Sequence, residues 1–230
     1  MNARTVDPHR PVRQDGEQSR ERLLRVGLAL FAQKGFAKTS TREIAEAAQT
    51  NIAAISYYFG DKAGLYRAAF FGPQQATGFG STAFADPALS LAQALRRFYG
   101  GFVEPLAQGE EVRLCLKLHF REMIEPTGLW QEEITQVIAP MHEALVQLLA
   151  RHLALPGGEG ARRDARLQRL AICLAGLAIN LHVGHEVNDS LAPGLAAGPA
   201  ALGAWTDFLV GAGLALVKAE AAERRREGVE

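Results

Sequence analysis

The chain has 230 residues, 48% of them apolar, and its 25 basic and 25 acidic residues give a formal net charge of zero. This composition excludes an intrinsically disordered chain, and the zero charge excludes a protein that coats nucleic acid without sequence preference. The charge is uneven, because residues 1–70 carry a net +4 and residues 71–230 a net −4. Length and charge together favour a small basic head and a larger, more acidic body.

The two cysteines and the absence of a leader pattern indicate the compartment. Cys115 and Cys173 each lie in an apolar helical pattern, so we expect two buried free thiols in a reducing cytoplasm. A disulfide or redox switch is the alternative. We expect no signal peptide, and no run that is both uncharged and predominantly apolar reaches the roughly 18 residues of a membrane span. We therefore expect a soluble, cytoplasmic protein with no membrane partner.

The head begins with an arm and a helix. Residues 1–16 contain two prolines, a glycine and three arginines with little apolar content, which predicts a mobile basic arm. Two interpretations stay open: an untethered tail, or an arm that reaches phosphates. An amphipathic helix follows, and Gly35 supplies the glycine that ends it. The apolar positions of this helix are Leu23, Leu24, Leu28, Leu30 and Phe31.

The segment from Ser40 to Lys62 predicts two short helices joined by a tight turn. Ser40 and Glu43 form a capping box, so a helix starts at about Thr41. Its apolar stripe is Ile44, Ala45 and Ala48.

The pattern breaks at Gln49, and Asn51 is a good N-cap for a second helix over residues 52–58. Ile52, Ile55 and Phe59 share one face of that helix, which we expect to lie on the first helix. Two helices joined by three or four residues match the helix-turn-helix unit that reads DNA. A helical hairpin inside a core is the alternative.

The remaining chain reads as helices without any strand signal. A helix runs from Lys62 through Phe70, a glycine-rich stretch follows, and Pro156 with two glycines forms a later linker. Further helices are expected over residues 89–107, 110–125, 130–155, 163–188 and 200–223. The predicted fold is therefore all-α, with a three-helix head and a C-terminal helical bundle that forms a dimer.

The stretches RLLRVGLALFAQKGFAKTSTREIAEAA and NIAAISYYFGDKAGLYRAAF, about residues 20–70, resemble the TetR family of transcriptional regulators. The resemblance implies a helix-turn-helix DNA-binding domain over residues 17–61 and a ligand-binding and dimerisation domain over residues 62–230. Gln49 stands where the family usually has glycine, so we expect a positive φ there. Ser56 stands where an aromatic residue is usual.

The resemblance also assigns roles in gripping the duplex. Thr39, Thr41 and Lys62 are expected at phosphates, Arg42 at a base edge or the backbone, and Tyr57 and Tyr58 at phosphates and sugars. From residue chemistry alone, Ala53 and Ala54 suit thymine methyls, and Arg42 is the best guanine reader. The candidate DNA-binding residues are Thr39, Thr41, Arg42, Asn51, Ala53, Ala54, Ser56, Tyr57, Tyr58 and Lys62.

The stretch around Arg121, Glu122, Met123, Glu125 and Pro126 resembles the ligand-binding domain of a CecR-like subgroup of that family. Because Glu122 and Glu125 lie three residues apart beside Arg121, we expect a solvated or ion-paired helix face rather than paired catalytic carboxylates. No nucleophile motif is present, so we expect no enzyme activity.

Two further patterns remain, a possible metal site and a possible effector cavity. His182, His185 and Glu186 have a spacing that can hold a metal, but we expect ordinary helix-flank histidines and no cofactor. An effector cavity competes with a fully packed core; for a cavity, His119 or Arg121 is the expected polar partner. The candidate cavity residues are Phe98, Phe102, His119, Met123, Trp130 and Met141.

The sequence thus predicts a homodimeric, ligand-responsive repressor that holds a palindromic DNA operator until a small molecule binds. We expect the dimer to form through the helices over 163–188 and 200–223, with Leu174 and Leu214 in the interface. The alternative is an all-α protein that binds a small molecule or a partner protein and uses its head for interaction only.

Overall fold

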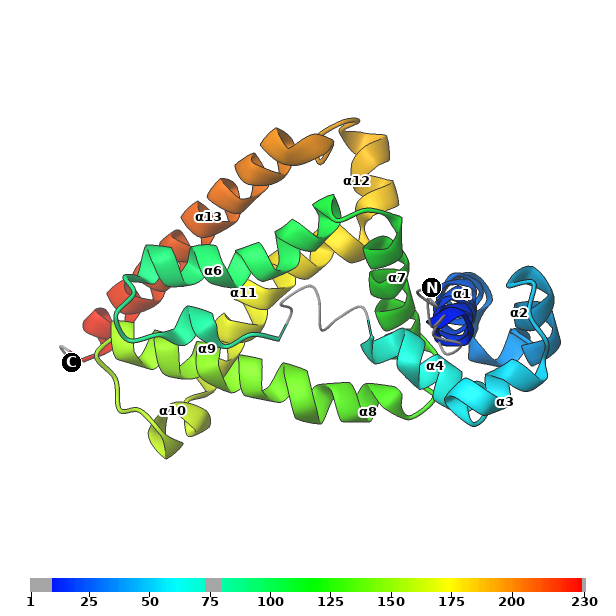
Figure 1. The fold of residues 1–230 in the computed structure, drawn as a ribbon. Helices are drawn as coiled ribbons and strands as arrows, with labels where there is room; N and C mark the ends of the chain where they lie inside the picture. The colour runs from blue at the N-terminus through cyan, green and yellow to red at the C-terminus, as the bar shows by residue number, and fades with distance from the viewer. Residues whose placement is uncertain (1–9, 73–79, 229–230) are drawn as a thin grey trace, which may run out of the picture. The chain divides into compact units, whose positions relative to one another are not determined.

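The computed structural model describes residues 10–72 and 80–228, with side chains left out at residues 10–14, 185 and 186. Every regular element in these ranges is helical, so the predicted all-α fold is confirmed (Figure 1). By their internal contacts, the described residues divide into two compact units. We call residues 10–72 with 110–129 the head unit, and residues 80–109 with 130–228 the body unit.

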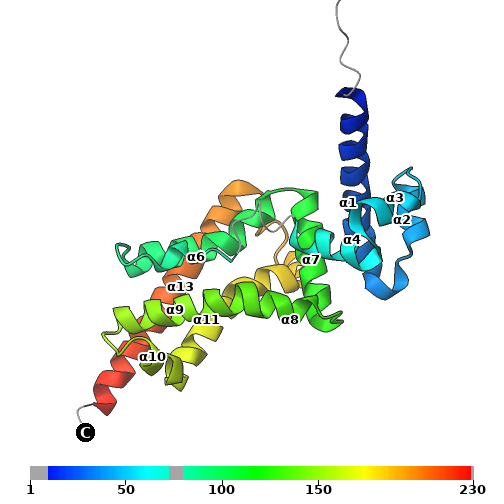
Figure 2. The same cartoon turned by 60° about the horizontal axis from the view of Figure 1, so that its bottom comes forward.

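The head unit is built around one long helix, which Figure 2 shows along its length beside α2, α3 and α4. Helix α1 packs against α4 and α7 and also contacts α2 and α3. The helices of this unit are α1 (Arg10–Lys38), α2 (Thr41–Ala47), α3 (Ala53–Phe59), α4 (Lys62–Phe71) and α7 (Glu110–Ile124).

The start of α1 differs from the predicted arm. Residues 10–16 are helical and belong to α1, while residues 1–9 lie outside the described residues. Gly35 interrupts α1 with a φ of 80°, which confirms the glycine stop expected there. The core of the unit contains Leu23, Leu28, Phe31, Ile44, Ile55, Leu65 and Phe70.

The body unit is a bundle in which α6 packs against α13 and α11, and α11 packs against α9. Its longer helices are α6 (Leu91–Val103), α9 (Ala139–His152), α11 (Ala165–Val183) and α13 (Gly198–Glu227). Its shorter elements are η1 (Ala83–Ala85), η2 (Glu104–Ala107), α8 (Leu129–Glu133), η3 (Ile134–Ile138), α10 (Glu159–Arg163) and α12 (His185–Leu191). Leu145, Leu148, Leu167 and Leu174 are fully buried in its core.

The helix expected over residues 130–155 consists of three segments. A turn of π-helix over Ile134–Ile138 separates α8 from α9, and Pro140 lies in the first turn of α9. Proline lacks the N–H that an α-helix interior requires, and a π-turn is one way to accommodate the missing bond.

An ion-pair network joins the start of α11 to the end of α13. The two terminal guanidinium nitrogens of Arg224 donate to Asp164, at 2.8 and 2.9 Å. Glu220 accepts from Arg224 at 2.6 Å and from Arg166 at 2.8 Å. Asp164 also caps α11 by accepting from the Leu167 N–H. The Arg224 guanidinium holds the pKa of Asp164 at about 2.

Two predictions about the body unit are wrong. Cys115 is buried as expected, but Cys173 is exposed on α11. The single helix expected over residues 163–188 is divided, because α11 ends at Val183 and α12 begins at His185, so His182 and His185 lie on different helices. Across the described ranges, no three metal-ligating side chains are grouped.

Within the part of the chain that the structure describes, α13 alone is long and apolar enough to cross a membrane by length and composition. Its most apolar stretch has a mean hydropathy of 1.6 and is 28% buried. The search of the sequence for long uncharged runs did not find this helix, because Asp207 lies within the helix and divides its apolar stretch. Core helices of soluble proteins pass the same test, and α13 packs against α6.

Candidate nucleic-acid interface and effector site

The first helix of the predicted reading unit begins where the sequence indicated. The Ser40 hydroxyl accepts the Glu43 N–H at 3.1 Å, and α2 starts at Thr41. The reciprocal half of the capping box is replaced, because the Glu43 carboxylate pairs with Lys34 of α1. This pair ties the start of α2 to α1.

The turn between α2 and α3 has the predicted left-handed residue. Gln49 has a φ of 52°, and the Asn51 side chain accepts the Ala53 N–H at 2.9 Å. Because α3 begins at Ala53, Ile52 precedes the helix and is 49% exposed, so its predicted packing is wrong. Ile55 is the side chain of α3 that is fully buried.

The outward side chains of α2 and α3 combine small groups with two larger ones. Tyr57 is 82% exposed, and its ring meets that of Tyr58 edge to face at 4.8 Å. Arg42 is exposed and donates to Glu46 at 2.8 Å, which raises the pKa of the guanidinium. Asn51, Ala53 and Ser56 are exposed, and Thr41, Ala54 and Tyr58 are half-buried.

Thr39 does not have the predicted geometry. Its side chain is 1% exposed, and its hydroxyl donates to the Gly35 carbonyl at 2.8 Å. The predicted phosphate contact of Thr39 is therefore wrong for this structure, in which the hydroxyl forms an internal hydrogen bond instead. That bond forms because α1 breaks at Gly35 and leaves this carbonyl available.

Lys62 opens α4 over an aromatic ring. Asp61 caps the helix by accepting the Gly64 N–H at 2.7 Å, which places Lys62 in the first turn. The Lys62 ammonium lies 4.3 Å from the centroid of the Phe36 ring, a cation–π contact.

Glu122 on α7 is fully buried, so the solvated helix face predicted for it is wrong. One carboxylate oxygen accepts the Tyr66 hydroxyl at 2.6 Å, and the other accepts the Thr127 N–H and hydroxyl at 2.6 and 2.8 Å. The spacing could have predicted this burial, since Glu122 follows Cys115 and Leu118 at helical intervals and so lies on the same buried face of α7.

Arg121 and Glu125 do form the predicted ion pair, at 3.1 Å. Arg121 also donates to the Gln33 carbonyl of α1 at 3.1 Å. A Cβ atom on Gly35 would lie 3.2 Å from Glu125 and 3.3 Å from Arg121. This close approach and the positive φ both require glycine at the break in α1.

The body unit contains a cavity of about 300 Å³ between η1, α6 and α9. Phe98, Phe102 and Met141, three of the six candidate residues, line it. Sequence reasoning missed the rest, because residues 80–84 show no periodic pattern and the remaining three are charged or glycine positions outside the apolar stripe of the expected helix. The other lining residues are Gly80, Ser81, Ala83, Phe84, Arg97, Gly101 and Glu104.

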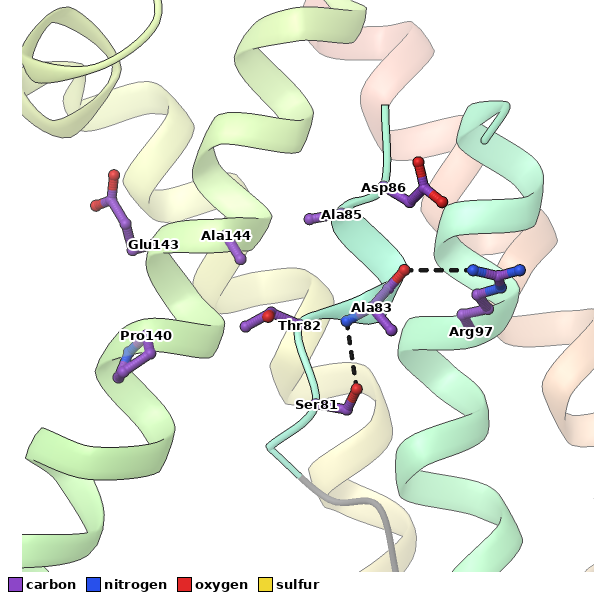
Figure 3. Close-up of a pocket in the computed structure, with 9 residues that line it drawn as sticks. All are labelled: Ser81, Thr82, Ala83, Ala85, Asp86, Arg97, Pro140, Glu143 and Ala144. Atoms are coloured by element: carbon purple, nitrogen blue, oxygen red, sulfur yellow. Dashed lines mark hydrogen bonds between the residues drawn. The ribbon is translucent and has the colours of Figure 1, made fainter. Parts of the chain in front are cut away.

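A wider cleft of about 820 Å³ adjoins this cavity, and Ser81, Ala83 and Arg97 line both. Figure 3 shows Arg97 on α6 beside the η1 segment, with α9 opposite. Arg97 donates to the Ala83 carbonyl at 3.4 Å. The remaining cleft residues are Thr82, Ala85, Asp86, Pro140, Glu143 and Ala144.

The other three candidate cavity residues lie elsewhere. Met123 is 42% exposed and His119 is buried, both on α7 of the head unit, and Trp130 lines neither hollow. The His119 ring stacks on Phe70 at 4.0 Å, and its Nδ1–H donates to the Cys115 carbonyl at 2.8 Å. Burial lowers the pKa of His119 to about 4, so the ring is neutral near pH 7.

The outer faces of α11, α12 and α13 carry many exposed apolar side chains. Leu174, expected there, is instead fully buried in the core of the body unit, and Leu214 packs against that core. Positions 176 and 211 are glycines with open space where a Cβ would stand. The exposed residues include Ile172, Leu177, Ile179, Val183, Val187, Leu191, Phe208 and Leu216.

The chain matches two protein families. Residues 23–69 match the bacterial regulatory proteins of the tetR family, and residues 91–216 match the C-terminal domain of the HTH-type transcriptional dual regulator CecR. CecR of Shigella flexneri is 36% identical over 146 residues, 59% of this chain and 65% of that protein. The probable HTH-type transcriptional regulator YttP of Bacillus subtilis is 49% identical over 47 residues, 20% of this chain and 23% of that protein. The matches thus span less than two thirds of either relative.

Solved structures share the fold. HlyIIR, a hemolysin II transcriptional regulator, aligns with a TM-score of 0.56 at 19% identity, covering 86% of this chain and 97% of that one. GusR of Salmonella enterica aligns with a TM-score of 0.55 at 19% identity, covering 93% of this chain and all of the other.

Proposed function

Since the chain belongs to the TetR family of bacterial transcriptional regulators, in the group with the CecR C-terminal domain, we propose that it is a ligand-responsive repressor. It binds a palindromic DNA operator as a homodimer in the cytoplasm. The observation that carries this proposal is the reading unit itself. Helices α2 and α3 are joined through the left-handed Gln49, and Arg42 and Tyr57 are exposed on them.

Each contact in the proposed interface follows from the chemistry of its side chain. Arg42 reads a guanine edge, for which it exchanges its Glu46 partner, and Ala53 and Ala54 pack on thymine methyls. Thr41, Ser56, Tyr57 and Tyr58 contact phosphates and sugars, and Asn51 is committed to its capping bond. Lys62 meets a phosphate at the start of α4, where the helix dipole adds attraction.

Genomic footprinting of the purified protein, followed by duplex binding at several salt concentrations, tests this function. We expect Arg42→Ala to weaken operator binding by about 1 to 3 kcal/mol and to relax preference at one base position. Lys62→Ala should weaken all duplexes alike and flatten the salt slope by about one phosphate. An equal loss on every sequence for Arg42→Ala makes Arg42 a phosphate contact instead.

Dimerisation is proposed through the exposed apolar faces of α11 and α13. A face that includes Ile172 and Phe208, 62% and 67% exposed, costs free energy in water unless another surface covers it. The open glycines Gly176 and Gly211 allow a second pair of helices to approach closely. A four-helix interface between two copies satisfies both features.

Phe208→Glu tests the interface without disturbing the core of the protomer. We expect this variant to sediment as a monomer and to bind operator poorly, because half-sites about 34 to 36 Å apart need both heads. Ala92→Glu, at an exposed position of α6, introduces the same single charge outside the proposed interface and should remain dimeric. Wild-type protein that is monomeric at micromolar concentration contradicts the proposal.

The effector is proposed to occupy the cavity lined by Phe98, Phe102 and Met141. Aromatic and thioether walls suit a mostly apolar ligand, and Arg97 supplies donors for an acceptor or acidic group on it. The dimer is proposed to exist in two forms, one with the head-to-head spacing that fits the operator and one with a different spacing. A ligand that binds the second form more tightly shifts the population toward it, by the ratio of the ligand's affinities for the two forms.

Gly101 offers a clean test of this cavity. It lines the space, and a Cβ at this position meets nothing within 4 Å. We expect Gly101→Leu to fill the cavity, leave operator binding intact and abolish induction, whereas Gly101→Ala leaves induction largely intact. A fully inducible Gly101→Leu variant removes this cavity as the effector site.

The second candidate function is an all-α module that binds a small molecule or a partner protein. The same cavity and apolar faces serve it equally well. Duplex binding separates the two, because each phosphate neutralised steepens the salt dependence, and a protein-binding module has none.

A further inference from the structure

A continuous set of contacts in the head unit leads from α7 to the first turn of α4. The Lys62 ammonium lies over the Phe36 ring, and that ring meets the Tyr66 ring at 5.0 Å. Tyr66 also meets Phe31 edge to face at 4.9 Å and donates its hydroxyl to Glu122 at 2.6 Å.

Tyr66 is confined on every side. It is 2% exposed and Glu122 is fully buried, so neither group can turn toward water. Burial and the Glu122 carboxylate raise the pKa of Tyr66, so its phenol stays protonated and donates. The two bonds from Thr127 hold the other carboxylate oxygen, which fixes the direction in which Glu122 receives Tyr66.

We propose that Glu122 is a positioning residue for DNA binding, which sets the place of the Lys62 ammonium through Tyr66 and Phe36. The inference rests on the proposed function, in which Lys62 contacts a phosphate. A lysine ammonium on a flexible stem loses side-chain entropy when it binds, and a ring that holds it beforehand reduces that loss. Glu122 belongs to the part matched by the CecR domain, and Lys62 to the part matched by the tetR family.

This role differs from simple stabilisation of the fold in what it predicts. A bond that only stabilises the head lowers the melting temperature and weakens every DNA contact alike. A bond that positions Lys62 acts on one phosphate, so its loss has no further effect once Lys62 is gone.

A double-mutant cycle on duplex binding by the full-length protein separates these roles. We expect Glu122→Gln and Tyr66→Phe each to weaken operator binding about two- to fivefold, the size of one cation–π contact, and to flatten the salt slope. On a Lys62→Ala background the same changes should have no further effect, and on an Arg42→Ala background their effects should add. Additive loss with Lys62→Ala overturns the proposal.

A second measurement needs no DNA. With lysines labelled at the ε carbon, the protons on the Lys62 ε carbon should resonate upfield in the wild type because of the Phe36 ring. In Glu122→Gln and Tyr66→Phe this signal should move toward the exposed lysines, and in Glu125→Gln it should stay. An unmoved signal overturns the positioning role. Wild-type protein that binds no duplex instead contradicts the proposed function, whatever the signal does.

Discussion

The head and body units use carboxylates in opposite ways to fix one helix against another. In the head, Glu122 is fully buried and accepts three hydrogen bonds from neutral groups. In the body, Asp164 and Glu220 pair with arginines, and their side chains remain 23% and 16% exposed. The head site depends on the direction of hydrogen bonds to a fully buried carboxylate. The body site depends on ion pairs between partly exposed groups.

The difference accompanies a difference in the length of the helices that each site joins, α4 and α7 in the head and α11 and α13 in the body. Helices α2, α3 and α4 have seven to ten residues each, so a few directional bonds must fix their angles. The body has helices of up to 30 residues around a leucine-rich core, and its ion pairs only add to that packing. The head should therefore be sensitive to single polar changes, and the body to pH and salt.

The largest effect is expected in the apolar core of the body. Leu145 is 1% exposed, and Leu145→Ala should lower the free energy of unfolding by about 2 to 5 kcal/mol, from lost burial and the cavity it leaves. Calorimetry against the wild type measures this. A loss below about 1 kcal/mol indicates a loosely packed core, contrary to the contrast drawn above.

The next largest effect is a difference in stability between variants of two glutamates, Glu122 and Glu125, three residues apart in sequence. Glu122→Gln should cost about 1 to 3 kcal/mol, because one amide oxygen cannot replace both carboxylate oxygens and a buried donor loses its partner. Glu125→Gln, the matched control in a largely exposed ion pair, should cost about 0 to 1 kcal/mol. Equal losses in chemical denaturation count against a directional bond in the head.

The ion pairs of the body should respond to acid. The pKa of Asp164 is about 2 in the folded protein, below the ordinary value of 3.8, so folding favours the charged form. This stability is present above pH 4 and is lost as the pH falls from about 4 to 2, on the order of 1 kcal/mol after solvent screening.

Asp164→Asn keeps the shape and an oxygen for the α11 cap but cannot pair as an anion. The unfolding free energies of wild type and variant should therefore differ at pH 5 and converge near pH 2. A difference that persists undiminished near pH 2 assigns the stability to the cap rather than to the charge.

The smallest effect concerns two left-handed turns, one in each unit. Gln49 and Ala154 have φ values of 52° and 55°, which favour glycine. Gln49→Gly should be neutral or stabilising, by up to about 1 kcal/mol, because relief of strain offsets the added unfolded-state entropy. Ala154→Gly is the parallel change in the body. A marked drop in melting temperature for Gln49→Gly alone reveals a side-chain bond that glycine removes.

The sequence by itself determined the local structure of the reading unit. The Ser40 and Asn51 caps, the glycine stop at Gly35 and the positive φ of Gln49 depend on neighbours a few residues away, and all four are present. The family could be recognised for the same reason, because its motif is a set of caps, turns and apolar stripes at fixed spacing. The predicted start of the second helix, Ile52, is one residue before the observed start at Ala53.

Only the tertiary structure decided which side of each helix packs into the core of its own unit. Leu174 and Ile172 are both large apolar residues of the same helix, yet Leu174 is fully buried and Ile172 is 62% exposed. Thr39 turns inward and Glu122 is buried because partners distant in the chain, or a broken helix, offer them hydrogen bonds. Periodicity identifies apolar and polar positions, but burial depends on what packs against them, and that is set by contacts between segments remote in sequence.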